Sequence, residues 1–164
     1  MKRIGILSDT HGYWDDKYLF YFADCDEVWH AGDIGTPIII ELLEKHCTVR
    51  AVCGNIDGGD LNRRFSKVLR FKVEECDVLM THIGGYPNSY APGIKQLLLD
   101  EKPDIFISGH SHILKVMRDQ KLGLLHLNPG AAGLKGFHKK VTMLRFQIDG
   151  KEISNMEIYD ADKY

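Results

Sequence analysis

The 164-residue sequence lacks the features that mark membrane, exported or polyanion-binding proteins. No apolar run approaches the ~20 residues that cross a bilayer, and Met1-Lys2-Arg3 leads directly into a strand-like run rather than a signal peptide. The formal net charge of −2 provides no general attraction to nucleic acid or to an anionic membrane. We therefore expect no membrane partner and no extended nucleic-acid substrate.

Cysteine is also scarce, and its spacing disfavours a structural zinc site with thiolate ligands. The four cysteines are widely scattered, without a CxxC pair: Cys25, Cys47, Cys53 and Cys76. Without an export signal, reduced thiols are favoured over disulfides, and a cytoplasmic enzyme is expected. Cys53 follows Val52 in a β-branched run, which favours a small core residue at that position.

The sequence predicts a single α/β (α+β) domain spanning residues 1–164. Its 44% apolar and 27% charged residues are ordinary for a globular protein, and no repeat or linker interrupts them. Strands are predicted at Lys2–Ser8, Glu27–His30, Thr48–Cys53, Val68–Val73, Val78–His82, Ile105–Ser108, Lys115–Arg118, Leu122–Leu127, Val141–Ile148 and Glu152–Tyr159. Helices are predicted at Asp15–Ala23, Pro37–Lys45 and Ile94–Glu101, with loops at Gly84–Gly93 and Asn128–Gly136. Two β-sheets packed face to face with helices outside accommodate this order.

Five short segments place polar donors where predicted strands end. They are Asp9-Thr10-His11, Gly32-Asp33, Gly54-Asn55, Thr81-His82 and Gly109-His110-Ser111-His112. The carboxyl ends of strands are where open α/β folds gather ligand-binding groups, so we expect these segments to meet. Their donors are two carboxylates, one amide and four imidazoles, which is enough to hold two divalent ions.

Each segment has a simpler interpretation when taken alone. Asp9-Thr10 and Gly32-Asp33 resemble ordinary turns, Gly54-Asn55 a left-handed corner, and a lone His82 a structural imidazole. Five such coincidences at strand ends are harder to explain than one shared site. Mixed oxygen and imidazole donors without thiolate suit Mn²⁺, Fe²⁺ or Zn²⁺. The combination therefore predicts a two-metal hydrolase.

The ordered set DxH…GD…GN…H…GHxH resembles the calcineurin-like metallophosphoesterase family, and within it the small bacterial and archaeal phosphodiesterases of YfcE type. The resemblance runs from Asp9 to His112, and a turn typical of that subgroup is present as Asn128-Pro129-Gly130. It implies a four-layer αββα sandwich of two mixed β-sheets flanked by helices. It also implies an enzyme that hydrolyses small phosphodiesters through a hydroxide bridging two metal ions.

Carried over residue by residue, the resemblance implies two divalent ions per chain, Mn²⁺ foremost, with Fe, Zn or Ni as alternatives. One ion would be held by Asp9, His11 and His112, the other by Asn55, His82 and His110, and Asp33 would bridge them. Asp33, Asn55 and His82 are the candidate catalytic residues. His30 and Asp57 are expected to orient the ligands without binding the ions. His46, His126 and His138 lie outside the motifs and are expected to be structural or solvated.

One position departs from the pattern of many relatives. Their asparagine is followed by a histidine assigned as general acid, whereas this chain has Ile56, as the YfcE-type subgroup also lacks that histidine. The departing oxygen would then be protonated by water or leave unaided. We therefore expect slow hydrolysis of esters with poor leaving groups.

The sequence gives only weak signals for substrate contacts. Tyr13, Tyr86 and Tyr90 lie in loops beside the metal segments, and Arg63 and Arg64 follow the asparagine loop. The tyrosines have two interpretations, stacking on a substrate or covering the edge of the core. The arginines likewise have two, contact with a phosphate or a solvated charge pair. A phosphomonoesterase or protein phosphatase and a non-catalytic scaffold remain alternative functions, and a homo-oligomer remains open.

Overall fold

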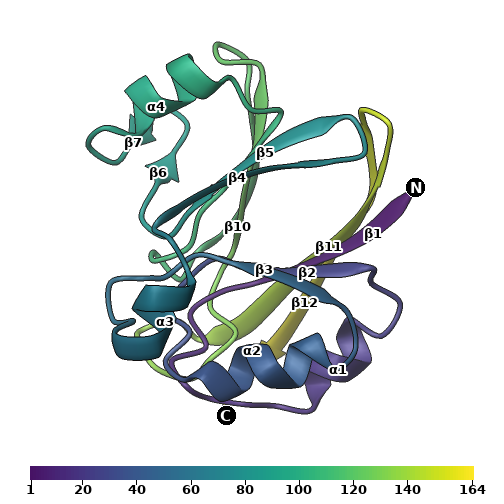
Figure 1. Ribbon diagram of the computed structural model, residues 1–164, viewed down its shortest axis with the longest axis vertical. Coiled ribbons are helices and arrows are strands. Elements are labelled where there is room, and N and C mark those ends of the chain that lie inside the picture. The colour runs from purple at the N-terminus through teal and green to yellow at the C-terminus, as the bar shows by residue number, and fades with distance from the viewer.

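The computed structural model describes residues 1–164 and contains two five-stranded sheets, one above the other in Figure 1. The first sheet has the order β12-β11-β1-β2-β3, in which β1, β2 and β3 are parallel and β11 is antiparallel to β1 and β12. Its strands are β1 (Lys2–Leu7), β2 (Glu27–His30), β3 (Thr48–Ala51), β11 (Lys140–Asp149) and β12 (Glu152–Asp162).

The second sheet has the order β4-β5-β8-β10-β9, with β5, β8 and β10 parallel at its centre. Antiparallel β4 and β9 form its edges. Its strands are β4 (Val68–Val73), β5 (Cys76–Thr81), β8 (Ile105–Ile107), β9 (Leu114–Asp119) and β10 (Leu124–Pro129). A separate two-stranded sheet consists of β6 (Gly85–Tyr86) and β7 (Ser89–Tyr90).

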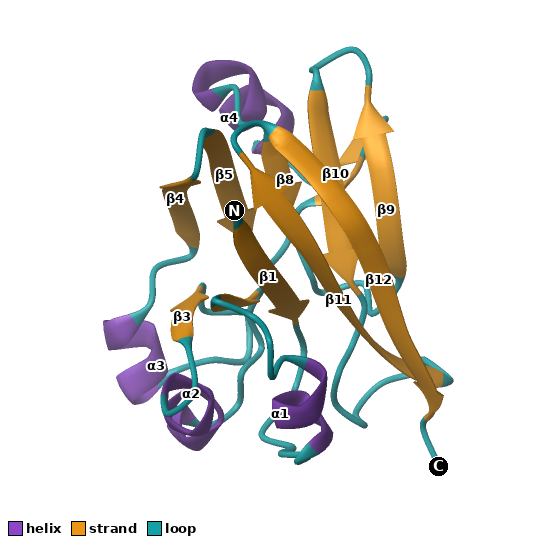
Figure 2. Cartoon of the chain, turned by 90° about the vertical axis from the view of Figure 1, so that its right-hand side faces the viewer, coloured by secondary structure: helices purple, strands orange, loops and turns teal.

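Helices lie outside the two sheets and complete a four-layer αββα sandwich, as predicted. They are α1 (Lys17–Tyr21), α2 (Pro37–Glu44), α3 (Gly59–Arg64) and α4 (Ile94–Glu101). In Figure 2, α4 lies at the end of the molecule opposite to α1, α2 and α3, with the strands between them. No helix is both long enough and apolar enough to cross a membrane.

Three buried clusters correspond to the three interfaces between layers. Between the sheets, Ile6 and Trp29 of the first sheet pack with Met80 and Ile107 of the second in a cluster of 16 buried residues. A second cluster fixes α1, α2 and α3 to the outer face of the first sheet, and a third fixes α4 to the second. Alternate strand residues enter different clusters because side chains along a strand point to opposite faces.

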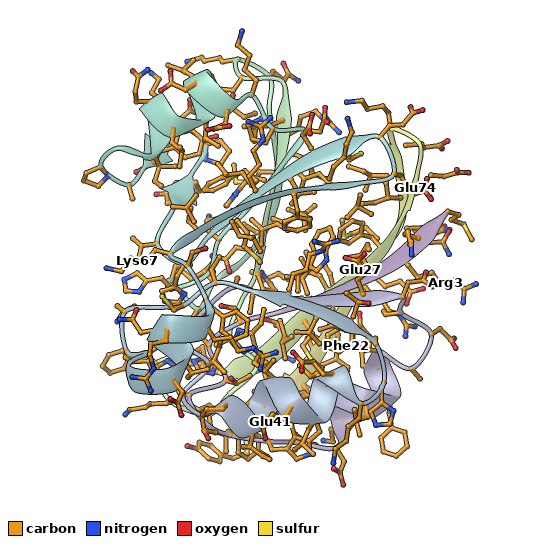
Figure 3. The ribbon with its side chains drawn as sticks, in the orientation of Figure 1. Arg3, Phe22, Glu27, Glu41, Lys67 and Glu74 are labelled. Carbon is orange, nitrogen blue, oxygen red and sulfur yellow. The ribbon has the colours of Figure 1, made fainter.

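Close approach of α1 to β1 depends on a glycine. A Cβ on Gly5 would overlap the aromatic ring of Phe22, which follows α1 and is buried against the sheet. Figure 3 shows Phe22 between the strands and the helices beneath them. The local sequence thus sets the distance between the helical layer and the first sheet.

Every predicted strand and helix is present, with bounds that differ by no more than three residues. The prediction missed α3, whose six residues bury only Leu61 and therefore show no helical periodicity. It also described Gly84–Gly93 as a loop, whereas that segment contains β6 and β7. Two-residue strands are too short to show an alternating pattern.

Candidate metal centre

All five predicted ligand segments begin at the carboxyl ends of parallel strands. Asp9, Asp33 and Asn55 follow β1, β2 and β3, which are neighbours in the first sheet. His82 and His110 follow β5 and β8, which are neighbours in the second. The site therefore lies where the strand ends of both sheets meet, on the side of Figure 1 where α3 follows β3 and β6 follows β5.

Side chains from these segments converge in two groups. Asp9, His11 and His112 place one candidate ligand atom each within 4.8 Å of one another. Asp33, His82 and His110 form a second such group. Six of the seven predicted ligands thus fall into two groups of three, and the second group contains Asp33 in place of Asn55.

Asp33 lies between the two groups. Its Oδ2 is 3.4 Å from His11 Nε2 in the first group and 3.2 Å from His82 Nε2 in the second. Its Oδ1 accepts a hydrogen bond of 3.1 Å from the Ile56 amide, which fixes the rotation of the carboxylate. One oxygen is therefore held facing both groups, as a bridging ligand requires.

Asn55 is the seventh predicted ligand, and it joins the second group through His110. The Asn55 Oδ1 and His110 Nδ1 atoms are 3.1 Å apart, and both residues are exposed. Across the site, His112 Nε2 lies 3.1 Å from Asp9 Oδ1. The exposed residues mark the open side of the site, and Asp9 and Asp33 form its buried floor.

The imidazole lone pairs fit bound cations. His82 Nδ1 lies 2.7 Å from the Ala31 carbonyl, so it carries the proton and leaves Nε2 as a lone pair directed at the carboxylates. His82 Nε2 and both ring nitrogens of His11 are buried without a hydrogen-bond partner. Lone pairs facing carboxylates repel unless a proton or metal ion lies between them, so these residues suit divalent metal.

The electrostatic environment keeps the floor anionic. Burial alone would raise the pKa of Asp9, but the adjacent His11, the hydrogen bond with His112 and the nearby His82 hold it far below its usual range. For Asp33 burial likewise raises the pKa, and the contact with His82 outweighs it, so the pKa is lowered. Both carboxylates are therefore available as charged oxygen ligands at neutral pH.

His30 supports the site rather than facing it. Its Nδ1 accepts a hydrogen bond of 3.2 Å from the Gly32 amide, so its Nε2 carries the proton and donates to Thr10 Oγ1 at 3.0 Å. Thr10 in turn donates to the Ile34 carbonyl. Burial lowers the pKa of His30 to about 4, which keeps the ring neutral. His30 thus ties the Asp9 loop to the Asp33 loop.

Asp57 holds the Asn55 loop against the Asp33 loop. Its carboxylate accepts three backbone hydrogen bonds, from Gly54 at 2.8 Å, Gly35 at 2.9 Å and Ile34 at 3.1 Å. Because all three donors are fixed by the loops themselves, the carboxylate is committed to this role. It has little remaining capacity to orient another side chain in the site.

Backbone strain is concentrated at the ligands. Five of the nine non-glycine residues with positive φ are Asp9, His11, Asp33, His110 and His112. This left-handed conformation costs roughly 1–3 kcal/mol per residue and is tolerated where function requires it. The turns bring side chains two residues apart toward one point, whereas an extended strand would hold them roughly 6.6 Å apart along one face.

Glycines leave room for the ligand rings. A Cβ on Gly32 would lie 2.6 Å from His82 Nδ1, and one on Gly136 would overlap the ring of His112. Gly32 belongs to a predicted segment, but the approach of Gly136 was not predicted. Nothing in the spacing of Gly136 points to the site, since it arrives through the loop after β10.

The end of β10 and the loop after it supply two further supports. Asn128 donates through its Nδ2 to the Gly109 carbonyl and to Ser111 Oγ, both at 3.1 Å, which fixes the segment that carries His110 and His112. His138 lies edge-on to His112 with ring centroids 5.0 Å apart. The sequence provides the Asn128 turn as a signal but none for His138, which lies far outside the motifs.

The residues predicted to contact substrate occupy varied positions. Tyr13 is part-exposed and bonds Asp15, whereas the ring of Tyr86 lies beneath Lys115 Nζ at 4.3 Å. The Tyr90 hydroxyl is committed to Asp119 at 2.6 Å. Two arginines are ion-paired, Arg63 with Asp60 and Arg64 with Glu44. None of these contacts reaches a candidate ligand.

Comparison with known proteins identifies the family. Residues 1–151 match the model of the calcineurin-like phosphoesterase superfamily domain. The chain belongs to the calcineurin-like phosphoesterase superfamily. It is 29% identical over 157 residues to a probable metallophosphoesterase of Methanothermobacter thermautotrophicus, covering 92% of this chain and 88% of that protein. Members of this superfamily bind divalent metals, in agreement with the two ligand groups of this phosphoesterase.

Solved structures show the same fold at lower identity. A protein characterised as a novel archaeal phosphodiesterase superposes with a TM-score of 0.76 at 21% identity, covering 96% of this phosphoesterase and 99% of that chain. A Vps29 from Entamoeba histolytica, in complex with Zn²⁺, superposes with a TM-score of 0.75 at 15% identity, covering 99% of both chains. The fold is thus shared by proteins described as phosphodiesterases and by Vps29 proteins.

Proposed function

We propose that this chain is a phosphodiesterase that uses two divalent metal ions, Mn²⁺ foremost, to hydrolyse small phosphodiesters. The observation that carries the proposal is the position of Asp33, whose Oδ2 faces imidazole nitrogens of both ligand groups. Asp9, His11 and His112 would hold one ion, and Asn55, His82 and His110 the other. The four cysteines are free, which suits the further proposal of a cytoplasmic enzyme.

The chain's own residues would orient the reactants. When bound, the two ions supply an activated water and offset charge on the phosphoryl oxygens. His82, fixed by its bond to the Ala31 carbonyl, keeps its Nε2 aimed inward. Asn55, at the exposed rim, retains amide hydrogens that can donate to a phosphoryl oxygen while its Oδ1 faces the site.

A diester fits the site better than a monoester. A monoester dianion needs more compensating charge, and Arg63 and Arg64 are already paired with carboxylates. Position 56 holds an exposed isoleucine instead of an imidazole, so this residue offers no proton to a departing oxygen. Esters with good leaving groups are then favoured. The archaeal neighbour described as a phosphodiesterase supports the same substrate class.

Metal removal and restoration test the proposal. Thorough chelation should abolish hydrolysis of bis(4-nitrophenyl) phosphate, and added Mn²⁺ should restore it, because no nucleophile–base pair in the site replaces the ions. The same preparation should hydrolyse 4-nitrophenyl phosphate much more slowly. Full activity of the stripped protein would exclude the two-metal assignment, and faster hydrolysis of the monoester would favour a phosphomonoesterase.

A non-catalytic scaffold is the second candidate, favoured by the shared fold with Vps29. Because that structure itself contains Zn²⁺, metal binding does not separate the two functions. Hydrolysis of a panel of diesters by protein with measured metal content does. Two bound ions with no turnover on any diester would support the scaffold.

A further inference from the structure

A pocket adjoins the second ligand group on the side of α4 and β4. It has a volume of about 220 Å³ and is lined by Asn55 and His82 together with Cys53, Gly54, Lys67, Val68, Thr81, Ile83 and Ile94. It therefore shares two proposed metal-site residues with the centre, while Lys67, Val68 and Ile94 come from segments outside the ligand motifs. A ligand in this pocket would lie directly beside a phosphate held at the ions.

The walls of this pocket are largely apolar and partly open to solvent. Val68 and Ile83 are each 45% exposed, and Ile94 is buried behind them. Ile83 directly follows His82, and Val68 begins β4 at the strand end nearest the site. Exposed aliphatic side chains beside a polar metal site cost free energy in water unless a ligand covers them.

One cation at the pocket is free of any carboxylate. Lys67 is exposed and forms no ion pair, although nearby Arg64 and Arg70 are each paired. Figure 3 shows Lys67 on the side of the molecule where α3 and β6 lie. An unpaired ammonium beside apolar walls complements an amphiphilic anion.

We propose that this pocket binds one aryl or similarly apolar ester arm of the substrate, and that Lys67 attracts the negative charge of the phosphate. This inference rests on the proposed phosphodiesterase function and adds the chemical class of the ester arm. The volume is below the roughly 300–1,000 Å³ of pockets that enclose whole drug-sized ligands, so it suits one arm rather than an entire substrate. Lys67 and Ile83 would then set specificity.

Charge removal at Lys67 tests the electrostatic part. Lys67→Met keeps the length of the side chain and should raise KM for bis(4-nitrophenyl) phosphate roughly three- to tenfold, with kcat within about twofold. It should also weaken the dependence of KM on salt, and Lys67→Arg should restore both values. Lys72→Met is the matched control, because Lys72 lies at the far end of β4, roughly 17 Å along the strand.

Binding to metal-free protein tests the apolar part independently of catalysis. Diphenyl phosphate should bind about tenfold or more tightly than dimethyl phosphate, because only the former buries apolar surface. In two-dimensional ¹H–¹⁵N NMR spectra, diphenyl phosphate should shift the amides of Val68, Ile83 and Ile94. Ile83→Ser or Val68→Ser should remove most of the preference, whereas Ile38→Ser, at an equally exposed isoleucine on α2, should not.

The outcomes separate this inference from the proposed function. Diester hydrolysis with unchanged KM in Lys67→Met and unchanged aryl preference in both serine variants would overturn the pocket assignment alone. A metal-loaded protein that hydrolyses no diester would overturn the proposed function, while the NMR titration would still decide the pocket. Shifts that map elsewhere, or equal binding of both phosphates, would exclude an apolar subsite here.

Discussion

Asp57→Asn should both destabilise the protein and weaken metal binding. The carboxylate accepts hydrogen bonds from three backbone amides, and a carboxamide of the same shape presents an N–H₂ group to at least one of them. A hydrogen bond to a charged group contributes about 1.5–3 kcal/mol, so the loss of one and weakening of the others predicts about 2 kcal/mol. The released Asn55 loop should lower metal affinity and activity roughly 10- to 100-fold.

Urea denaturation of the metal-free protein measures the free energy of unfolding, and a metal titration measures affinity. Asp60→Asn is the matched control, because Asp60 lies three residues away and pairs only with exposed Arg63. It should change stability by less than about 0.5 kcal/mol. If Asp57→Asn behaved like this control in both assays, the assignment of Asp57 as the clamp between the two loops would be wrong.

Three further changes test other parts of the account. Asp33→Asn should reduce activity by more than the roughly 100-fold typical of a supporting residue, because Asp33 Oδ2 faces both ligand groups. Near-normal turnover with two ions bound would contradict the assignment of Asp33 as the bridging ligand. Ile56→His should flatten the dependence of rate on leaving-group pKa across a matched diester series. The gain in rate should be smaller than the ~10²–10⁴-fold of a well-positioned general acid, because Asp57 already accepts three backbone hydrogen bonds and cannot orient the new imidazole. An unchanged slope would show that the proton comes from elsewhere. Burial lowers the pKa of His126 from 6.5 to about 4, so the unfolded chain takes up its proton first and stability falls as pH drops through that window. At pH 5 the expected loss from this residue is about 2 kcal/mol relative to neutral pH, and urea titrations of His126→Leu should show a correspondingly smaller decline.

The sequence predicts the architecture because each strand contributes to a periodic pattern that burial enforces. Ile4 and Ile6 alternate with residues of the opposite face, and Pro37 begins α2 where a proline is tolerated. By contrast, α3 exposes most of its short length and leaves only Leu61 as a signal. Elements that bury little leave little pattern in a sequence.

The centre could be anticipated for a similar reason, since strand ends must meet once the sheets form. The supporting contacts could not, because they depend on tertiary approach between distant segments. Gly136 and His138 reach His112 through a loop whose path no local pattern encodes. The left-handed backbone at Asp9 and His112 is equally hidden, since aspartate and histidine occur in many other conformations.

Metal stoichiometry of the purified, stripped protein tests the central claim most directly. Equilibrium dialysis against Mn²⁺, with elemental analysis of the protein, should give two ions per chain for the natural sequence. His112→Asn and His82→Asn should each reduce the number to about one, because each removes a ligand from only one group. A saturating value of one ion or none in the unaltered, folded protein would contradict the two-metal account.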